Sequence, residues 1–423
     1  MLLTAAAATT KFSLNGSDKN VETDGIGNQG MSIASLKLFK VAIPLKKVIK
    51  HASFERSESE NLVVRVTLSD GIVGYGEGVP RSYVTGETPE SAIAALEAHD
   101  WSAIMGRPSS FPQVVERLET LTLPEIEGDP RGMAGNAARC ALEMAILDAY
   151  GLRFGESIGR AVELAKVEGL KRLAQPQRVR YSAAITAESA RSERISALKI
   201  RIYGFHQVKI KVGTRGQDDG RRLERMRKLL GRRMDIRLDA NEAWAVAELV
   251  DRVQPLLRFG PTALEQPVPH ADVEALAELR PRLGVPVMLD ESLCGYPDAL
   301  SALELRTADL FNVRLSKCGG ILPSLRIIGL AHRSGLGVQL GCHPGETALL
   351  SAAGRHVASR VGGLRYVEGS YDRHILAANL TTQDFTFGYG GRARPIKGPG
   401  LGVKVDPAAL EAITLSSREV RYD

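Results

Sequence analysis

The sequence predicts an α/β protein in which a (β/α)8 barrel of the TIM type carries a separate α+β capping domain. Short β-branched runs recur along the second half of the chain, and each ends in a charged residue. These residues are Lys211, Asp239, Glu265, Asp290 and Lys317, which follow one another at intervals of 28, 26, 25 and 27 residues. One strand, one helix and two short loops need about that length, so each charged residue marks the carboxyl end of a strand.

The capping domain is predicted from strands and helices near the start of the chain. Residues 61–68 and 72–77 have strand-like patterns and flank the turn signal Ser69-Asp70-Gly71. A further strand is expected over residues 32–43. Helical patterns then follow at residues 90–99, 111–121 and 136–151. Strands followed by helices are typical of an α+β domain.

The barrel is predicted from alternating strands and helices that begin near Val179. Its eight strands are expected at residues 179–185, 208–212, 236–239, 262–265, 286–290, 310–315, 336–340 and 366–368. The sequence after Gly369 is loop-like and is expected to return to the capping domain. We therefore divide the chain into a flexible tail (1–31), the N-terminal part of the capping domain (32–157), the barrel (178–369) and a C-terminal segment (370–423).

Composition restricts the classes of protein to which the chain can belong. Of its 423 residues, 44% are hydrophobic and 25% are charged, as in ordinary soluble globular proteins. No apolar run approaches the ~18 residues of a membrane-spanning helix. The net charge is +6, but no basic run is interleaved with aromatic residues, which argues against nucleic-acid binding. The four cysteines form no CxxC pair, so we expect a reduced protein in the cytoplasm.

Three of the strand-end residues are carboxylates, and together they predict a metal site. Asp239, Glu265 and Asp290 end neighbouring strands, and the carboxyl ends of barrel strands meet at one mouth. Three buried like charges repel one another and need a cation. Oxygen ligands without clustered cysteine or histidine favour Mg2+, with Mn2+ as a possible substitute. Asn241 and Glu291 lie beside these ligands in the sequence and are expected to support them.

Lys211 and Lys317 are predicted to be acid/base groups on opposite sides of this metal, on strands 2 and 6 of eight. A nearby cation lowers the pKa of an ammonium group, and Lys209, on the same strand face as Lys211, acts in the same direction. A lysine tuned in this way can act as a base near neutral pH. With a substrate carboxylate on the metal, one lysine can remove the α-proton while the metal stabilises the enediolate. The second lysine either returns a proton to the opposite face or stays charged while a bond breaks or forms elsewhere.

His343, Glu346 and Glu368 are the remaining polar residues expected at the mouth. His343 follows strand 7 and is interpreted as a supporting residue or a substrate contact, with a general base as the rival interpretation. Glu346 and Glu368 are each expected to meet a cationic or hydroxyl group of the substrate, or else to cap a helix or strand.

The chain resembles the enolase superfamily, and within it the muconate lactonizing enzyme subgroup. The resemblance is carried by the helix at residues 141–148 and by the motifs Lys209-x-Lys211, Asp239-Ala240-Asn241, Glu265-Gln266-Pro267, Asp290-Glu291-Ser292 and Lys317-Cys318-Gly319-Gly320. It covers nearly all of residues 32–423 and implies the lysine base and Mg2+ chemistry known for that superfamily. It also implies a homo-oligomer, and capping-domain loops around residues 51–59 and 81–87 that close over the substrate.

This resemblance implies a Mg2+-dependent isomerase that abstracts the proton α to the carboxylate of a small substrate. An amino-acid or dipeptide racemase or epimerase comes first; the alternatives are a muconate-type cycloisomerase and an o-succinylbenzoate synthase-like lyase. Dipeptide epimerases carry an Asp-x-Asp at strand 8, where this chain has Glu368-Gly369-Ser370. Glu346-Thr347, in contrast, matches a Glu-Thr at strand 7 of epimerases in this group. The intact set of three carboxylates and two lysines argues against a barrel that only binds.

Overall fold

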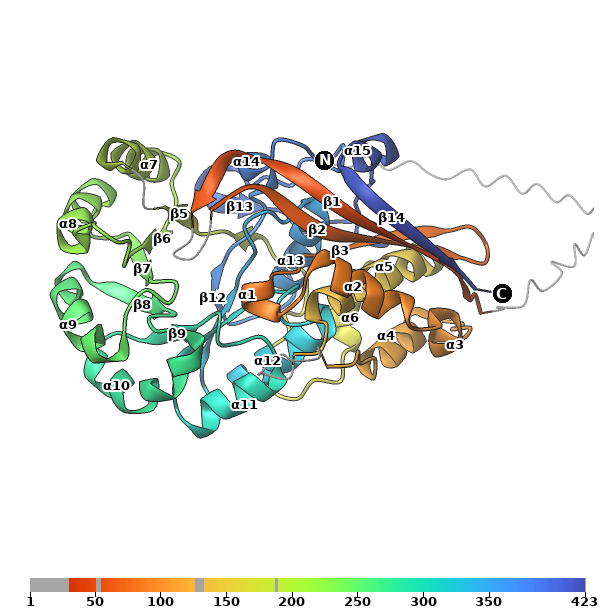
Figure 1. Ribbon diagram of the computed structural model, residues 1–423, viewed down its shortest axis with the longest axis horizontal. Helices are drawn as coiled ribbons and strands as arrows, with labels where there is room; N and C mark the ends of the chain where they lie inside the picture. The colour runs from red at the N-terminus through yellow and green to blue at the C-terminus, as the bar shows by residue number, and fades with distance from the viewer. Residues whose placement is uncertain (1–29, 51–54, 126–132, 187–188, 423) are drawn as a thin grey trace, which may run out of the picture.

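The protein consists of a barrel and a capping domain that packs against it (Figure 1). The computed structural model describes residues 30–50, 55–125, 133–186 and 189–422. The predicted tail, residues 1–31, lies outside the described residues except for its last two. The domain bounds 32–157, 178–369 and 370–423 stay predictions.

The capping domain is built on a four-stranded sheet in the order β14-β1-β2-β3. Its strands are β1 (Ile33–Lys50), β2 (Glu55–Leu68), β3 (Val73–Gly78) and β14 (Thr414–Arg421), and all neighbours are antiparallel. β14 pairs with β1 from Ser35↔Arg421 to Val41↔Thr414. The C-terminal segment therefore returns to the capping domain, as the sequence predicts.

Helix α5 (Asn136–Phe154) packs directly on β3 through small residues. Three glycines at alternate positions of this strand, Gly74, Gly76 and Gly78, share the face that meets the helix. A Cβ on Gly76 would lie 2.0 Å from Ala141 O, and one on Gly74 would lie 2.2 Å from Ala149 N. Only glycine permits this approach of backbone to backbone.

The remaining short helices of the capping domain surround this pair of elements. They are α1 (Ser82–Thr85), α2 (Pro89–Glu97), α3 (Trp101–Met105), α4 (Phe111–Glu119), α6 (Arg160–Leu164), α14 (Asp372–Ile375) and α15 (Pro407–Ala412). Some begin at side-chain caps: the side chain of Thr88 accepts from Ser91 N at the start of α2, and that of Asp406 accepts from Ala408 N at the start of α15.

The barrel is an eight-stranded parallel sheet whose spatial order follows the chain. Its strands are β5 (Ala183–Ile185), β6 (Gln207–Lys211), β7 (Asp235–Asp239), β8 (Pro261–Glu265), β9 (Val287–Leu289), β10 (Leu310–Val313), β11 (Gly337–Leu340) and β12 (Leu364–Val367). The sheet curls until its edge strands meet, and Ser182 N donates to Val367 O at 2.8 Å across the join. The predicted fold class is confirmed.

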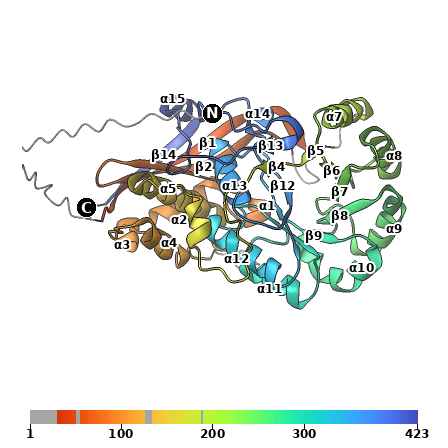
Figure 2. The same cartoon turned by 180° about the vertical axis from the view of Figure 1, so that it is seen from behind.

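Helices alternate with these strands and lie outside the sheet, as Figures 1 and 2 show. They are α7 (Ala190–Ile202), α8 (Asp219–Leu230), α9 (Leu249–Val253), α10 (Leu276–Leu283), α11 (Tyr296–Glu304), α12 (Ile321–Arg333) and α13 (Ala348–Ala358). Short 3-10 helices add η1 (Val246–Glu248), η2 (Gln254–Phe259), η3 (His270–Ala275) and η4 (Tyr389–Gly391).

The first predicted barrel strand, residues 179–185, is wrong as a single strand. It divides into β5 and an earlier piece, β4 (Val179–Arg180), which pairs with β13 (Arg392–Ala393). The chain passes between the two sheets because Tyr181 N donates to Gly391 O while Ser182 N donates to Val367 O.

Helix α13 begins at Ala348, three residues after Gly345. Gly345 has a φ of +103°, which a helix cannot include. Thr347 is the N-cap, and its side chain accepts a hydrogen bond from Leu349 N. The loop between them keeps Glu346 at the barrel mouth.

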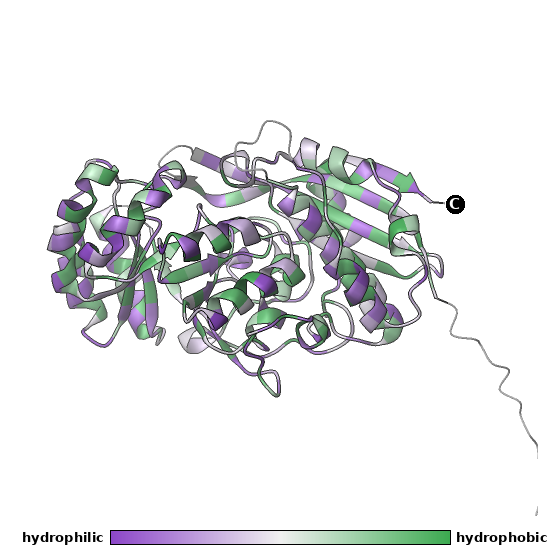
Figure 3. Cartoon of the chain, turned by 90° about the horizontal axis from the view of Figure 1, so that it is seen from below, coloured by the Kyte–Doolittle hydropathy of each residue, from purple (hydrophilic) through white to green (hydrophobic). Residues whose placement is uncertain are grey.

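Apolar residues form the core of both parts, and Figure 3 shows hydrophobic and hydrophilic segments alternating along the outer helices. The inside of the barrel is different, because Arg237 and Lys317 are both completely buried there. Within the described ranges, no helix is both long and apolar enough to cross a bilayer.

Candidate active site

The predicted site residues meet at the carboxyl ends of the barrel strands. Lys211 on β6 is the register partner of Asp239 on β7, and Asp239 is the partner of Glu265 on β8. Asp290 follows β9 directly, and Lys317 follows β10 by four residues. The sequence spacing therefore translates into adjacent positions around one mouth.

The three carboxylates predicted to bind metal are all buried. Burial raises the pKa of Glu265 to about 8, and the charges of Asp239 and Asp290 add to this effect. Glu265 Oε2 makes no hydrogen bond, while Glu265 Oε1 accepts from Asn312 Nδ2 at 2.8 Å. Burial therefore makes the charged form of Glu265 costly unless cations lie nearby.

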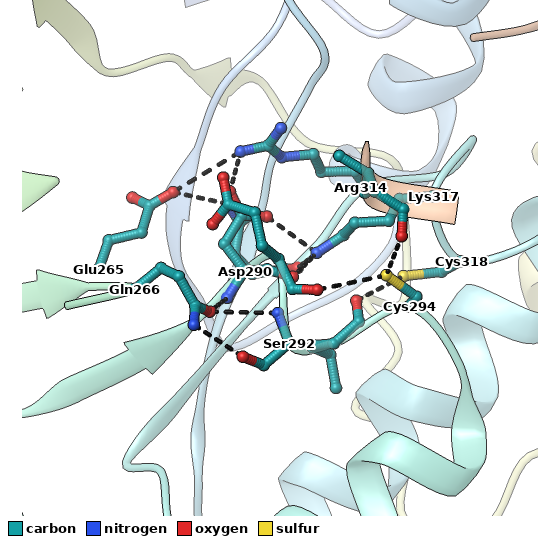
Figure 4. Close-up of polar contacts among 12 residues, drawn as sticks. Glu265, Gln266, Asp290, Ser292, Cys294, Arg314, Lys317 and Cys318 are labelled. Carbon is teal, nitrogen blue, oxygen red and sulfur yellow. Dashed lines mark hydrogen bonds and ion pairs between the residues drawn. The ribbon is translucent and has the colours of Figure 1, made fainter. Parts of the chain in front are cut away.

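Asp290 is turned toward the cations Arg314 and Lys317 (Figure 4). Its Oδ1 lies 2.8 Å from Lys317 Nζ, and its Oδ2 pairs with Arg314 Nη2. In this arrangement of side chains, no three acidic, histidine or cysteine groups within the described residues surround a common metal position. A metal at the three carboxylates would have to replace the contacts that Arg314 and the lysines now make.

Two arginines at the site were missed from the sequence. Arg237 lies two residues before Asp239 on the same face of β7; it pairs with Glu368 and approaches Glu265 to 3.9 Å. Arg314 approaches Glu265 to 3.8 Å besides pairing with Asp290. The period of two along a strand would have placed Arg237 inside the barrel with Asp239.

Lys209 is an ion-paired residue in the middle of the carboxylates. Its Nζ lies 3.3 Å from Asp239, 3.5 Å from Glu265 and 3.1 Å from Glu368. Burial opposes its charged form, but Glu265, Glu368 and Asp239 outweigh this and hold the pKa of Lys209 well above its ordinary value. Lys209 is thus a fixed cation.

The environments of Lys211 and Lys317 differ. Burial lowers the pKa of Lys211, and Lys209 acts in the same direction against Asp239, as predicted. Burial also opposes the charge of Lys317, but Asp290 outweighs it, so the pKa of Lys317 is raised. The lower pKa predicted for Lys317 applies to a site that holds a metal ion, and it stays a prediction. In this structure its Nζ also donates to Asn312 O at 3.0 Å and to Asp290 O.

Asn241 and Glu291 join the loops after β7 and β9. Asn241 Nδ2 donates to Glu291 Oε1 at 3.3 Å, and Asn241 N donates to Asp239 Oδ1 at 3.2 Å. Asn241 has a positive φ of 42°, a strained conformation of the kind found at functional loops. Burial raises the pKa of Glu291 well above its ordinary value, and Asp290 reinforces this.

His343 and Glu346 are buried together in the loop after β11. His343 N donates to Glu346 Oε1 at 2.6 Å, and His343 Nδ1 lies 3.6 Å from the same oxygen. Burial lowers the pKa of His343 well below its ordinary value, with further contributions from Arg314, Arg81 and Lys317. Burial raises the pKa of Glu346 to about 8. This pair combines a neutral imidazole with an acid that is easily protonated.

Glu368, at the end of β12, already has two cationic partners. It lies 3.1 Å from Lys209 Nζ and pairs with Arg237. Burial disfavours its charge, but Lys209 and Arg237 outweigh this and lower the pKa of Glu368. The carboxylate is thus a structural counter-ion in the barrel.

The capping loop at residues 81–87 is pinned at both ends. Arg81 is buried and donates to Ser59 Oγ and Glu60 O, each at 2.8 Å. Glu87 accepts from Ala137 N and Ala138 N at the start of α5, at 2.8 and 2.9 Å. Of the other expected loop, residues 51–54 lie outside the described residues.

Comparison with known protein families accounts for most of the chain. Residues 33–160 match the model described as mandelate racemase/muconate lactonizing enzyme, N-terminal domain, and residues 193–409 match the model described as enolase C-terminal domain-like. The chain belongs to the mandelate racemase/muconate lactonizing enzyme family of the enolase superfamily. The resemblance inferred from the sequence motifs is thereby confirmed.

Relatives within this family differ in the reactions that their names describe. The chain is 28% identical over 408 residues to the N-succinyl-L-Arg/Lys racemase of Bacillus cereus, covering 92% of this chain and 100% of the relative. It is 28% identical over 392 residues to muconate cycloisomerase 1 of Rhodococcus opacus, covering 91% and 99%. The dipeptide epimerase of Cytophaga hutchinsonii, whose crystal structure contains Mg and the dipeptide D-Ala-L-Val, superposes with a TM-score of 0.77 at 23% identity, covering 92% and 100%.

Proposed function

We propose that this enolase-superfamily member is a Mg2+-dependent isomerase that abstracts the proton α to the carboxylate of a small substrate, and that it is a racemase or epimerase. One observation carries the proposal. Lys211 ends β6 and Lys317 lies in the loop after β10, while Asp239 and Glu265 end β7 and β8 and Asp290 directly follows β9. In a closed eight-stranded barrel, β6 and β10 face each other across the mouth.

The residues fit a divalent cation by the chemistry of their oxygens and by their places at the ends of three neighbouring strands. Asp239, Glu265 and Asp290 would hold it, and the buried Glu265 Oε2, which has no hydrogen bond, offers a ligand oxygen. Hard oxygen donors favour Mg2+ over softer metals, with Mn2+ as a substitute. When bound, the ion would neutralise the substrate carboxylate and so make the α-proton more acidic. Lys209 and Arg314 would give up contacts with these carboxylates.

The two lysines are assigned the proton transfers. A substrate α-carbon held between them presents one face to Lys211 and the opposite face to Lys317. One lysine removes the proton of one stereoisomer, and the other delivers a proton to the opposite face, which inverts the carbon. The direct bonds from Lys317 Nζ to Asp290 and Asn312 O fix the direction from which it approaches.

The pairing of Glu368 favours a substrate with no free ammonium group beside the α-carbon. Glu368 is the acid that the sequence offers for such an ammonium, but Lys209 and Arg237 already neutralise it. An N-acylated amino acid needs no such partner, because its amide is neutral. The name of the Bacillus cereus relative, an N-succinyl amino-acid racemase, supports this preference over a dipeptide.

A cycloisomerase is the second candidate, and the environment of Lys317 favours it. Three oxygen contacts hold the Lys317 ammonium, from Asp290 and from Asn312 O. A permanently charged Lys317 would leave Lys211 as the single base, as in the muconate-type or lyase reaction. The Rhodococcus relative carries a cycloisomerase name.

The test is α-proton exchange in D2O, followed by NMR with Mg2+ present. The substrates are both enantiomers of N-succinyl amino acids, both epimers of a dipeptide, and cis,cis-muconate. We expect exchange and inversion of both N-succinyl enantiomers, weaker activity on the dipeptide, and loss of activity on chelation of the metal that MgCl2 restores. Exchange of one enantiomer only, or lactone formation from muconate, would replace the racemase with a single-base reaction. Size-exclusion chromatography with light scattering would test the expected homo-oligomer.

A further inference from the structure

The capping helix α5 contacts the loop that carries Lys317. Asn136 Nδ2 donates to Lys317 O and to Cys294 O, both at 2.8 Å. Cys294 lies in the loop after β9, close to Asp290. A single capping-domain amide thus joins the two barrel loops that bring Lys317 and Asp290 together.

Two more side chains of α5 continue the same contact. Arg139 Nη1 donates to Gly319 O, and Glu143 Oε1 accepts from Leu322 N at 3.0 Å. Arg139 also donates to Glu143 Oε2 at 2.6 Å. The three positions are spaced by three and four residues, so they lie on one face of the helix. Both Arg139 and Glu143 are buried.

The glycines after Lys317 make this approach possible. Gly319 and Gly320 have φ values of +88° and +114°. A Cβ on Gly320 would lie 2.6 Å from Glu143 Oε1. The Lys317-Cys318-Gly319-Gly320 motif thus provides both the lysine and the space that the helix needs beside it.

The start of α5 is arranged so that Asn136 can reach the barrel. The N-cap of α5 is Gly135, which has no side chain to satisfy the free N–H groups at the start of the helix. Glu87 performs that task instead, since it accepts from Ala137 N and Ala138 N. The Asn136 amide is thereby available for the two barrel carbonyls.

The backbone carbonyl of Lys211 is held by a side chain of the barrel domain. Lys211 O accepts from Arg222 Nη1 of α8 at 3.0 Å. Arg222 is fixed in turn by Glu193 and Asp219, on α7 and α8. The two lysines are therefore supported by different parts of the molecule.

We propose that Asn136 is a positioning residue for Lys317, through which the capping domain sets the geometry of one of the two acid/base groups. The effect on catalysis rests on the proposed function. Reacting atoms must be held within a fraction of an ångström, and a shift of about 1 Å can cost about 100-fold in rate. Loss of the Asn136 bonds releases Lys317 O and Cys294 O, and so loosens Lys317 against Asp290.

The experiment compares α-proton exchange of each enantiomer separately in wild type, Asn136→Ala and the near-isosteric Asn136→Asp, which lacks the amide donor. We expect exchange of the enantiomer that faces Lys317 to fall by about 10- to 100-fold, with the other enantiomer changed less than about twofold. Arg222→Lys should give the opposite asymmetry. Asp148→Asn, on the same helix but bonded to Tyr75 N and Leu401 N, is the matched control and should not discriminate between enantiomers.

Equal losses for both enantiomers, or no loss, would overturn the positioning role. The Lys317→Ala variant first shows which enantiomer exchanges its proton with Lys317. If the wild-type protein does not exchange both enantiomers, the proposed two-base function is contradicted, but the role of Asn136 is not. In that case a crystal structure of Asn136→Ala tests the positioning role of Asn136. A displaced 316–320 loop with an unmoved Lys211 supports the proposal, and an unmoved loop refutes it.

Discussion

Lys211 and Lys317 are both lysines with the same predicted role, yet they differ in burial, in the direction of their pKa shifts and in the residues that hold their backbone carbonyls. Lys211 is partly exposed, its pKa is lowered by burial and by Lys209, and its carbonyl is held by Arg222. Lys317 is completely buried, its pKa is raised by Asp290, and its carbonyl is held by Asn136 of the capping domain. The position of a strand in the barrel thus places each lysine at the mouth, while the neighbouring side chains determine its pKa.

The most direct test of the roles of the two lysines is to remove each side chain in turn. Lys211→Ala and Lys317→Ala should each lower turnover by at least 10²- to 10⁴-fold, the usual cost of losing a general base. Each variant should retain exchange of the one enantiomer whose proton faces the remaining lysine. Steady-state polarimetry and NMR exchange in D2O measure the two quantities. Near-normal turnover in either variant would contradict the two-base mechanism.

The barrel side can be tested through its buried charges. Arg237→Met leaves Glu368 and Glu265 without a cation that now lies beside them, and removing one partner of a buried pair costs about 3–5 kcal/mol. Urea denaturation should show a loss of this size in the free energy of unfolding. Arg365→Met is the control, since Arg365 is exposed and its side chain donates to a backbone carbonyl, Thr262 O, instead of a buried carboxylate. Similar losses in both variants would mean that burial of the charge is not the cause.

The capping side can be tested at the glycine next to Glu143. Gly320→Ala should cost roughly 1–3 kcal/mol, because its φ is +114° and the added Cβ would lie 2.6 Å from Glu143 Oε1. Gly216→Ala is the matched control, with a φ of +77° but nothing within 4 Å of the Cβ. We expect Gly320→Ala to impair exchange at the Lys317 side as well, and Gly216→Ala to affect stability alone. Thermal unfolding and the exchange assay together provide the check.

The last effect concerns pH and the capping helix. Burial raises the pKa of Asp148 from 3.8 to about 7, so the folded state binds the proton more tightly than the unfolded state. Stability from this group is present below about pH 4 and is lost as the pH rises to about 7, with a slope of at most about 1.4 kcal/mol per pH unit. Asp148→Asn should therefore gain stability relative to wild type across that window. Chemical denaturation at several pH values measures the difference, and a constant difference would contradict it.

The strand ends could be predicted from the sequence because a regular interval between charged residues is a local property of the chain. The same spacing located Lys211, Asp239, Glu265, Asp290 and Lys317 around one mouth. Side-chain contacts between residues that are far apart in the sequence could not be predicted from this spacing. Nothing near Glu368 in the sequence indicates Arg237 and Lys209 as its counter-ions, and nothing near Lys317 indicates Asn136.

The raised pKa that Lys317 has in this structure could not be predicted for the same physical reason. A pKa is the sum of burial and of several charges at short distance, and the nearest charge, Asp290, faces Lys317 instead of the other carboxylates. The division of residues 179–185 into two strands likewise depends on bonds to Gly391 and Val367, which are contributed by distant segments. Local sequence patterns thus predict the strands and helices. The exact ends of these elements and the pKa values of the site residues depend on contacts between distant segments.

The pairing of β14 with β1 has a consequence for how this protein is made. The first strand of the capping sheet leaves the ribosome early, and its edge partner is synthesised only after the entire barrel. At about 5–20 residues per second, the hydrogen-bonding edge of β1 waits tens of seconds for its neighbour. During that interval an unpaired strand edge is open to pairing with other nascent chains. Until β14 is made, this edge of β1 is the part of the capping sheet that is open to wrong pairing.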